Sequence, residues 1–600
     1  MLEPARGTTA KSWPPVVAMG SALVLIFLVF PNPLRVPNND PTASAEYAPV
    51  PGRQESAENA NFGETGLASS GGIGAGGEGF GFLSGSPPGK PPPQFRPRQL
   101  DCVGSPPRQT EDELSPPCVA FFDGDNGDET WEGVTRDEIL IVYYNDFGVE
   151  GDMTTPYRAS DENGLQTDYY YANHTRTVKA QLRYFSKRFQ TYGRRVRMIA
   201  VPSGGGLATR PNQRQGEAII VANQYKPFAV TILIENAQDF APLMADYEVP
   251  SFGWNEDVPL GEYRKSAPYF WSFMPDQATE TKWSASFICR KLWANKDGDN
   301  GEGRARFTTD PTLEGRQRKF GLIYQGGQER RRGPFLEQLA LQLQAELREQ
   351  CGLEVKMQPY VGNGNAATTM QQFKGEGITT VICYCTPQQT ELHVPALQNA
   401  ATSLNYFPEW FWDHASAMDR ALWQRNYGSP EHQGFGTSFL WRQNAFKQSY
   451  AYKAYLSEEP NSIPNLRFNF EIYHVFLNVF SGIQAAGPKL TPETIKKGMF
   501  TFGYQNPDYA YVPTGGYGDF GPSPYTFVHT AMGWWWDPTG TPPGGRAGEG
   551  CIRVMYDGKR YYGGNPASGR QWPFGDQDIK QGPDGDWPCT EDERREFSTN

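Results

Sequence analysis

The chain has 600 residues, more than one hydrophobic core usually supports, so two or more folded units are expected. Its 67 Asp and Glu residues outnumber 55 Lys and Arg residues, giving a net charge of −12. This acidic balance, with no long basic run, argues against nucleic acid as a partner.

An apolar run from Val16 to Phe30 follows Arg6 and Lys11 near the start of the chain. The run is shorter than the roughly 20 residues of a bilayer span and is typical of an export signal. We expect residues 1–31 to direct export and to remain as a membrane anchor, which predicts an extracytoplasmic protein. Cleavage followed by secretion is the alternative.

Low-complexity sequence rich in glycine and proline follows this run, as in Gly71–Gly77 and Pro91–Pro93. Such a segment cannot bury a core and should behave as a flexible, partly extended tether. The sequence therefore predicts a linker over residues 32–130.

Strands and helices alternate from residue 139 onward. The expected strands are 139–144, 195–201, 228–234 and 249–254, and the expected helices between them are 170–189, 213–224 and 239–247. Such alternation favours a parallel sheet with helices on both faces.

A second alternating unit begins at Arg318. Its expected strands are 318–325, 353–360, 379–386, 409–412 and 434–440, with helices at 335–351, 366–374, 391–405 and 415–425. Further helices are predicted at 446–456 and 470–486 and from Thr491, and regular structure should become sparse after residue 501. The sequence thus predicts an α/β protein with two Rossmann-like lobes.

Candidate binding residues follow from this fold class, because open α/β sheets bind ligands at the carboxyl ends of their strands. In the first unit these positions hold Tyr144, Asn145, Ser203, Asn236, Ala237, Trp254 and Asn255. In the second unit they hold Gln325, Thr386, Asp413 and His414. Most are polar or aromatic, as a ligand cleft requires.

The eight cysteines include no Cys-x-x-Cys pair, so neither a zinc ribbon nor a thioredoxin motif is expected. An even count in an exported chain favours disulfides. We expect the local pairs Cys102–Cys118 and Cys551–Cys589. Two acidic runs, at 123–128 and 297–302, lack the sixth-position glycine of a calcium loop, and no metal or cofactor is expected.

Sequence motifs for catalysis are weak. His393, His414 and His432 show no metal-binding spacing, and no Gly-x-Ser-x-Gly nucleophile turn occurs. We therefore expect no enzymatic activity. A secreted hydrolase stays open as an alternative.

Several segments together resemble the type I periplasmic solute-binding proteins, in their leucine/isoleucine/valine-binding branch. The resemblance spans residues 130–565. The segments that carry it are Gly133–Ile139, Tyr192–Val196, Arg318–Tyr324, Phe470–Pro488 with Leu490–Pro492, and Gly550–Tyr561.

The resemblance implies the type I fold, in which three hinge crossings join the two lobes. We place these crossings near Pro275, at 440–445 and at 511–520. The first lobe would then comprise residues 131–276 and 446–510, the second 277–445 and 511–565, and 566–600 would form a tail.

In this family a ligand binds between the lobes, and a membrane permease reads their closure. The resemblance gives Asp413 the role of binding a ligand ammonium group, whereas Trp254 would fill space that an amino-acid backbone occupies in the family. The expected ligand is therefore an amino acid, an amide or a larger aromatic or polar solute. We expect a monomer that serves an ABC-type permease, with a ligand-sensing ectodomain for a signalling partner as the alternative.

Overall fold

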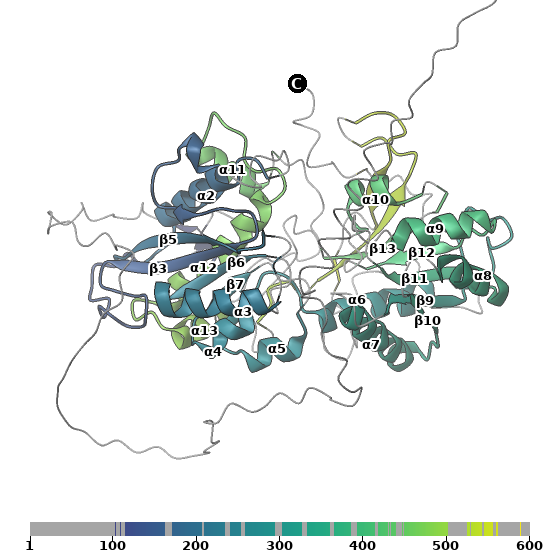
Figure 1. Ribbon diagram of the computed structural model, residues 1–600, viewed down its shortest axis with the longest axis horizontal. Coiled ribbons are helices and arrows are strands. Elements are labelled where there is room, and N and C mark those ends of the chain that lie inside the picture. The colour runs from purple at the N-terminus through teal and green to yellow at the C-terminus, as the bar shows by residue number, and fades with distance from the viewer. Residues whose placement is uncertain are drawn as a thin grey trace, which may run out of the picture. The chain divides into compact units, whose positions relative to one another are not determined.

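The computed structural model has two large β-sheets, and helices flank each of them (Figure 1). The structure describes residues 102–103, 108–109, 115–162, 171–206, 209, 211–234, 240–253, 258–293, 303–326, 333–360, 365–385, 393–413, 418–429, 431–432, 434–439, 447, 449–501, 525–528, 530–542, 545–555, 560–561 and 589. A small hairpin of β1 (Cys102–Val103) and β2 (Arg108–Gln109) precedes them.

The first sheet has the strand order β4-β5-β3-β6-β7-β8, and only the β4–β5 pair is antiparallel. Its strands are β3 (Glu138–Asn145), β4 (Gly151–Asp152), β5 (Arg195–Pro202), β6 (Ala229–Leu233), β7 (Ser251–Gly253) and β8 (Phe270–Ser272). Its helices are η1 (Ala159–Asp161), α2 (His174–Arg188), α3 (Pro211–Ile220) continued by η4 (Val221–Tyr225), α4 (Ala241–Asp246), α5 (Leu260–Lys265), α11 (Tyr450–Glu458), α12 (Asn469–Ala486) and α13 (Pro492–Thr501).

The centre of the first lobe is a core of apolar side chains. β6 is buried at every position, as the middle strand of a sheet covered on both faces must be. Helix α12 packs against β6, β7 and α2, while α4 packs against β7 and β8. The late helices α11 to α13 therefore belong with the first sheet, although the whole second sheet up to β13 precedes them in the chain.

The second sheet has the order β10-β9-β11-β12-β13-β14-β15, parallel through β13 and antiparallel at its last two pairs. Its strands are β9 (Phe320–Gln325), β10 (Lys356–Tyr360), β11 (Thr380–Tyr384), β12 (Glu409–Trp412), β13 (Gly434–Ser438), β14 (Met532–Asp537) and β15 (Cys551–Val554). Its helices are α6 (Gln277–Phe287) continued by η6 (Ile288–Leu292), α7 (Gly333–Cys351), α8 (Ala366–Glu376), α9 (His393–Ser403) and α10 (Ala421–Tyr427).

One glycine is required by the packing of this sheet. A Cβ atom at Gly436 in β13 would lie 1.7 Å from the backbone oxygen of Trp412 in β12. The two strands could not keep their spacing with any larger residue, so Gly436 fixes how closely β12 and β13 approach each other.

Three crossings connect the two sheets. The first leads from β8 to α6, whose N-cap Asp276 accepts a hydrogen bond from the Thr279 backbone N–H at 3.1 Å. The second leads from β13 to α11, and the third leads from α13 to β14. In the third, Thr526 pairs with Ser272 of β8 before the chain enters β14 at Met532.

The predicted fold class, two α/β lobes joined by three crossings, is confirmed by this topology. Two strands that the sequence did not predict, β14 and β15, follow residue 501 and complete the second sheet. Neither sheet is wholly parallel. The exact lobe bounds stay predictions, since residues 440–446 and 502–524 lie outside the described residues.

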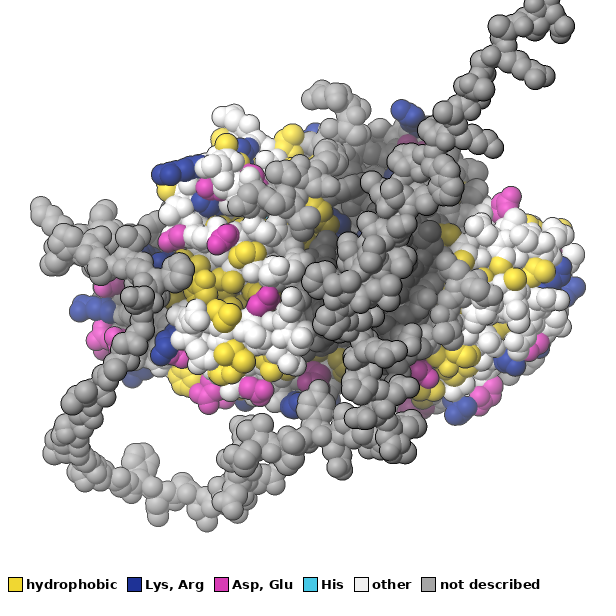
Figure 2. All heavy atoms as spheres, viewed as in Figure 1, with side chains coloured by type: hydrophobic (Ala, Val, Ile, Leu, Met, Phe, Trp, Pro, Cys, Tyr) yellow, Lys and Arg dark blue, Asp and Glu magenta, His cyan; other side chains and the backbone are white. Residues whose placement is uncertain are grey.

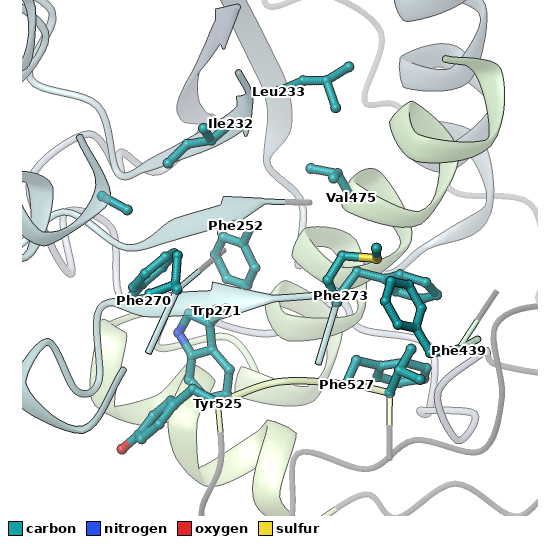
Figure 3. Close-up of a cluster of buried hydrophobic side chains, with 14 of the residues drawn as sticks. Ile232, Leu233, Phe252, Phe270, Trp271, Phe273, Phe439, Val475, Tyr525 and Phe527 are labelled. Carbon is teal, nitrogen blue, oxygen red and sulfur yellow. The ribbon is translucent and has the colours of Figure 1, made fainter. Parts of the chain in front are cut away.

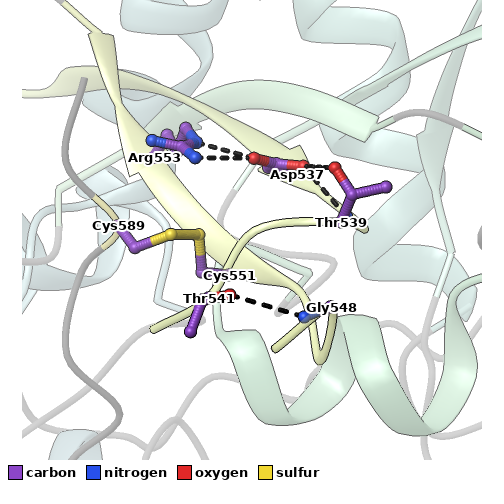
Figure 4. The surroundings of a disulfide bond; sticks show 7 residues. All are labelled: Asp537, Thr539, Thr541, Gly548, Cys551, Arg553 and Cys589. Atoms are coloured by element: carbon purple, nitrogen blue, oxygen red, sulfur yellow. Dashed lines mark hydrogen bonds and ion pairs between the residues drawn. A yellow bond between two sulfur atoms is a disulfide. The ribbon is translucent and has the colours of Figure 1, made fainter. Parts of the chain in front are cut away.

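Disulfides tie several elements together. Cys289 of η6 bonds to Cys351 of α7, and Cys383 bonds to Cys385 at the end of β11. The predicted Cys551–Cys589 bond is confirmed and joins the tail to β15 (Figure 4). Cys118 is also disulfide-bonded, but the side chain of its predicted partner, Cys102, lies outside the described part.

The surface of the described chain carries both signs of charge. On the face shown in Figure 2, Lys and Arg side chains are interspersed with Asp and Glu side chains and with scattered hydrophobic groups. Within the described part, no helix is long and apolar enough to cross a membrane. The expected anchor over residues 1–31 lies outside that part and stays a prediction.

Candidate functional site

Both sheets have the same strand order in their parallel part. Numbered along the chain within each lobe, and leaving the antiparallel strand β4 aside, the order is 2-1-3-4-5: β5-β3-β6-β7-β8 in the first and β10-β9-β11-β12-β13 in the second. In such doubly wound sheets the chain switches direction between strands 1 and 3, and a crevice opens at their carboxyl ends. The two switch points lie between β3 and β6 and between β9 and β11.

Tyr144 lies at the first switch point, near the end of β3. Its ring stacks on Phe240 with the centroids 4.0 Å apart and the planes 8° from parallel. Its hydroxyl donates a hydrogen bond to Glu217 of α3, and Arg214 lies 3.4 Å from the hydroxyl. Burial raises the pKa of Tyr144 far above its usual range, and Glu217 adds to the shift. The phenol therefore stays protonated and acts as a donor.

Asn145 ends β3, and its side chain organises the loop that follows. Its amide nitrogen donates to the Val149 carbonyl at 2.9 Å, and its amide oxygen accepts from the backbone N–H groups of Phe147 and Val149 at 3.1 and 3.0 Å. These bonds shape the rim of the first switch point. A direct contact of Asn145 with a ligand stays a prediction.

A buried ion pair that the sequence did not reveal lies beside these residues. Asp146 and Arg214 are both fully buried and meet at 2.8 Å. Ser203, at the end of β5, donates to the other oxygen of Asp146 at 2.6 Å. The carboxylate thus joins the ends of β3 and β5 to α3. The only sequence signal was an acidic residue directly after a strand.

The second switch point lies between the buried ends of β9 and β11. Gln325, which closes β9, is 1% exposed, and Tyr384 at the end of β11 is 1% exposed. Asp413 follows β12 and is 4% exposed. Burial raises the pKa of Tyr384 well above its usual range, and the carboxylates of Asp413 and Glu280 raise it further. Tyr384 and Asp413 are therefore close enough to interact, and Glu280 of α6 is close enough to act on the Tyr384 hydroxyl.

The remaining predicted site residues lie outside the described part of the chain. They are Asn236, Ala237, Trp254, Asn255, Thr386 and His414. Of the predicted set, the structure brings Tyr144 and Asn145 to one switch point and Gln325 to the other, with Asp413 close to Tyr384 beside it. It adds Asp146, Arg214, Glu217, Tyr384 and Glu280, which sequence reasoning did not identify.

His432 is a structural residue of the second lobe. The indole N–H of Trp410 donates to its Nδ1 at 3.1 Å, so its Nε2 carries the proton and faces the Gln398 carbonyl at 3.0 Å. Burial lowers its pKa to about 4. Among the described residues, no group of three or more His, Cys, Asp and Glu side chains could hold a metal ion.

Aromatic rings from all three crossings gather next to the first sheet (Figure 3). Phe273 of the first crossing stacks on Phe527 of the third with the centroids 5.1 Å apart. Trp271 of β8 meets Tyr525 edge-to-face at 4.8 Å. Phe439 of the second crossing is drawn beside Phe273 and Phe527 in the same cluster. The crossings are therefore packed against one another.

Comparisons with known proteins give structural similarity only. No protein-family model matches the sequence, and no curated protein matches it. A solute-binding protein of an ABC transporter from R. palustris, in complex with 4-hydroxybenzoate, is 13% identical; the match covers 71% of this chain and 98% of that one, with a TM-score of 0.46.

Two further solved structures are similar to a comparable extent. An ABC transporter substrate-binding protein from Desulfitobacterium hafniense in complex with Leu is 12% identical, over 71% of this chain and 100% of that one, with a TM-score of 0.43. A leucine-binding protein from Thermotoga maritima is 10% identical, over 72% and 99% of the two chains, with a TM-score of 0.43. The strand order of the chain's own two sheets defines the fold.

Proposed function

We propose that this chain is an extracytoplasmic solute-binding protein that captures a small organic solute between its two lobes and delivers it to an ABC-type permease. It performs no chemistry on the solute and acts as a monomer, tethered to the membrane by residues 1–31. The observation that supports this proposal most is the repeated 2-1-3-4-5 sheet, joined by three crossings. Each sheet contributes one crevice, and the crossings allow the crevices to close on a common ligand.

Closure needs contacts from both lobes, because a ligand shifts a two-state equilibrium only by its differential affinity for the two states. On the first lobe, we propose that Tyr144, Asn145, Asn236, Ala237, Trp254 and Asn255 contact the solute. On the second lobe, we propose Gln325, Thr386, Asp413 and His414. Asp413 accepts a hydrogen bond from a donor group of the solute, and Tyr384 restrains that carboxylate.

A thermal-shift screen of the purified ectodomain tests the proposal. The panel holds amino acids, amides and aromatic acids, including leucine and 4-hydroxybenzoate. A ligand at 100 times its dissociation constant stabilises by about 2.7 kcal/mol, a shift of several degrees. We expect at least one stabilising solute, and we expect Asp413→Asn to remove its effect.

The exposed Glu354, which pairs with Arg348 at the surface, provides the matched control. Glu354→Gln should keep the full ligand-induced shift. Incubation of each stabilising solute with the protein, followed by mass spectrometry of the small molecules, separates a carrier from a hydrolase. Turnover of a solute that is lost in Asp413→Asn would show that the protein is an enzyme and not a carrier. The absence of any stabilising solute across the panel would weaken the proposal of a carrier.

A further inference from the structure

Two consecutive residues of the C-terminal segment contact both later crossings and the helix that follows the first. Arg560 and Tyr561 follow β15 and are 1% and 0% exposed. Their partners are Phe439, which comes directly after β13, Thr530 and Ala531, which come directly before β14, and Trp283 of α6.

The guanidinium of Arg560 connects the second crossing to the third. One of its nitrogens, Nη2, donates to the backbone carbonyls of Phe439 and Thr530, each at 2.6 Å, and Nε donates to the Thr530 hydroxyl at 2.9 Å. Burial lowers the pKa of Arg560 to about 9, still above neutral pH, so the group remains a cation. Charge-assisted bonds of this kind are about twice as strong as neutral ones.

Tyr561 fastens the same segment to its other neighbours. Its backbone forms an antiparallel bridge with Ala531, with N–H···O distances of 2.8 and 3.0 Å. Its hydroxyl donates to the Trp283 carbonyl at 3.1 Å, which reaches the helix that begins just after the first crossing. Tyr561 therefore binds both the third crossing and α6, next to the guanidinium of Arg560.

We propose that Arg560 and Tyr561 form a latch that limits how far the second and third crossings can bend. The Phe439 carbonyl lies where the second crossing leaves β13, and the Thr530 carbonyl lies where the third crossing approaches β14. A single planar guanidinium bound to both carbonyls keeps them at a fixed separation. This proposal rests on the lobe movement of the proposed function but needs no ligand for its test.

Arg553 offers a matched control in the neighbouring strand. Its guanidinium binds Asp537 through Nε and Nη2, each at 2.8 Å, across the pair β14–β15 (Figure 4). Both residues belong to the second sheet, so this pair does not join one crossing to another. Arg553→Gln removes a half-buried arginine contact of the same sheet without touching the latch.

Hydrogen exchange in the full chain without ligand measures the local effect. In Arg560→Gln we expect exchange about tenfold or more faster in peptides covering 434–439 and 525–532, because the charge-assisted bonds to both carbonyls are lost. Peptides from β3 and β5 should exchange at the wild-type rate. Arg553→Gln should leave both crossing peptides unchanged.

The distance between the lobes measures the proposed consequence. Spin labels on non-natural amino acids at Ile219 and Leu341, which are 49% and 53% exposed, report the separation of the lobes without adding cysteines. We expect a broader distance distribution in Arg560→Gln and an unchanged one in Arg553→Gln. Arg560→Lys keeps the charge but not the planar fork, and it should fall between wild type and Arg560→Gln.

Three results would overturn the latch. One is an unchanged distance distribution in a folded Arg560→Gln protein. Another is faster exchange spread evenly over both lobes, which would make Arg560 a general stabilising residue. If Arg560→Gln does not fold, Arg560→Lys decides: wild-type exchange in the crossing peptides and a wild-type distance distribution would refute the proposal, and selective loosening of the crossings would support it.

Discussion

At the scale of single residues, one carboxylate holds the amino-terminal edge of the second sheet. Glu409 of β12 is fully buried and binds Arg318 through two contacts of 2.8 and 3.0 Å. It also accepts bonds from the Thr380 hydroxyl at 2.6 Å and from the Arg306 and Phe307 backbone N–H groups at 2.6 and 2.8 Å. Both carboxylate oxygens of Glu409 therefore accept hydrogen bonds, as a buried charge requires.

We expect Glu409→Gln to lower the free energy of unfolding by about 3–5 kcal/mol, because it leaves the buried Arg318 without its counter-charge. Urea unfolding followed by tryptophan fluorescence measures the change. The exposed pair of Glu354 and Arg348 is the control, and Glu354→Gln should leave the midpoint unchanged. Equal midpoints for Glu409→Gln and wild type would contradict this assignment.

The same carboxylate predicts a pH dependence. Burial by itself raises the pKa of Glu409, but Arg318 and the hydrogen bonds outweigh burial, so the pKa lies below the ordinary value of 4.5. A lowered native pKa contributes stability that is present above the unfolded value and is lost as the pH falls through the native one. The difference in unfolding free energy between wild type and Glu409→Gln should therefore shrink only below about pH 4.5.

The sequence predicted which residues lie at the strand ends, but it did not predict which side chains contact each other. The ends of β3 and β9 were expected to carry Tyr144, Asn145 and Gln325, because an apolar run followed by polar residues marks where a buried strand stops. The pair Asp146–Arg214 spans 68 positions in the sequence. Which arginine reaches which carboxylate depends on how α3 packs, and no local pattern contains that information.

At the scale of elements, one buried acid, Glu458, helps to attach α11 to α2. Glu458, whose side chain is 4% exposed, faces Arg183, Lys187 and Arg188 of α2 at contact distances up to 3.7 Å. The contact brings the chain back to the first lobe after the second crossing. Basic residues in the last turn of α2 also suit the negative end of that helix.

We expect Glu458→Ala to loosen α11 and to cost about 1–2 kcal/mol, a value reduced because the three cations are partly solvated. Hydrogen exchange should become faster in residues 450–458 and stay unchanged in β9 and β11. Lys453→Ala, at an exposed position of the same helix, is the control. If both variants exchange alike, the ion cluster does not anchor the helix.

Strongly periodic elements were predictable, and helices and strands with unusual sequences were not. Helix α12 was expected at 470–486 and occupies Asn469–Ala486, because its apolar positions recur with helical spacing. Helix α6 was missed because its buried face includes Gln277, Thr281 and Ser284 rather than aliphatic side chains. Strand β14 (Met532–Asp537) was also missed; it pairs with β13, nearly a hundred positions earlier in the chain, and with β15, which begins 14 positions after β14 ends.

At the scale of the whole molecule, the fold class followed from alternation alone. Two series of alternating strands and helices are typical of two largely parallel sheets, and the repeated strand order gives each sheet a switch point. The third crossing could not be located in the same way, because Tyr525–Val528 joins the first sheet through a bridge to Ser272. Glycine-rich and aromatic sequence does not indicate such a long-range pairing.

Native mass spectrometry of the ectodomain, purified without added ligand, tests the capture of a solute most directly. We expect a fraction of the protein to carry one small organic molecule, to lose it on mild activation, and to return to the bare mass. Asp413→Asn should arrive without that molecule, whereas Glu354→Gln should retain it. Wild-type protein that carries no solute after purification from the native host would contradict the proposed function, as would a bound molecule that Asp413→Asn retains in full.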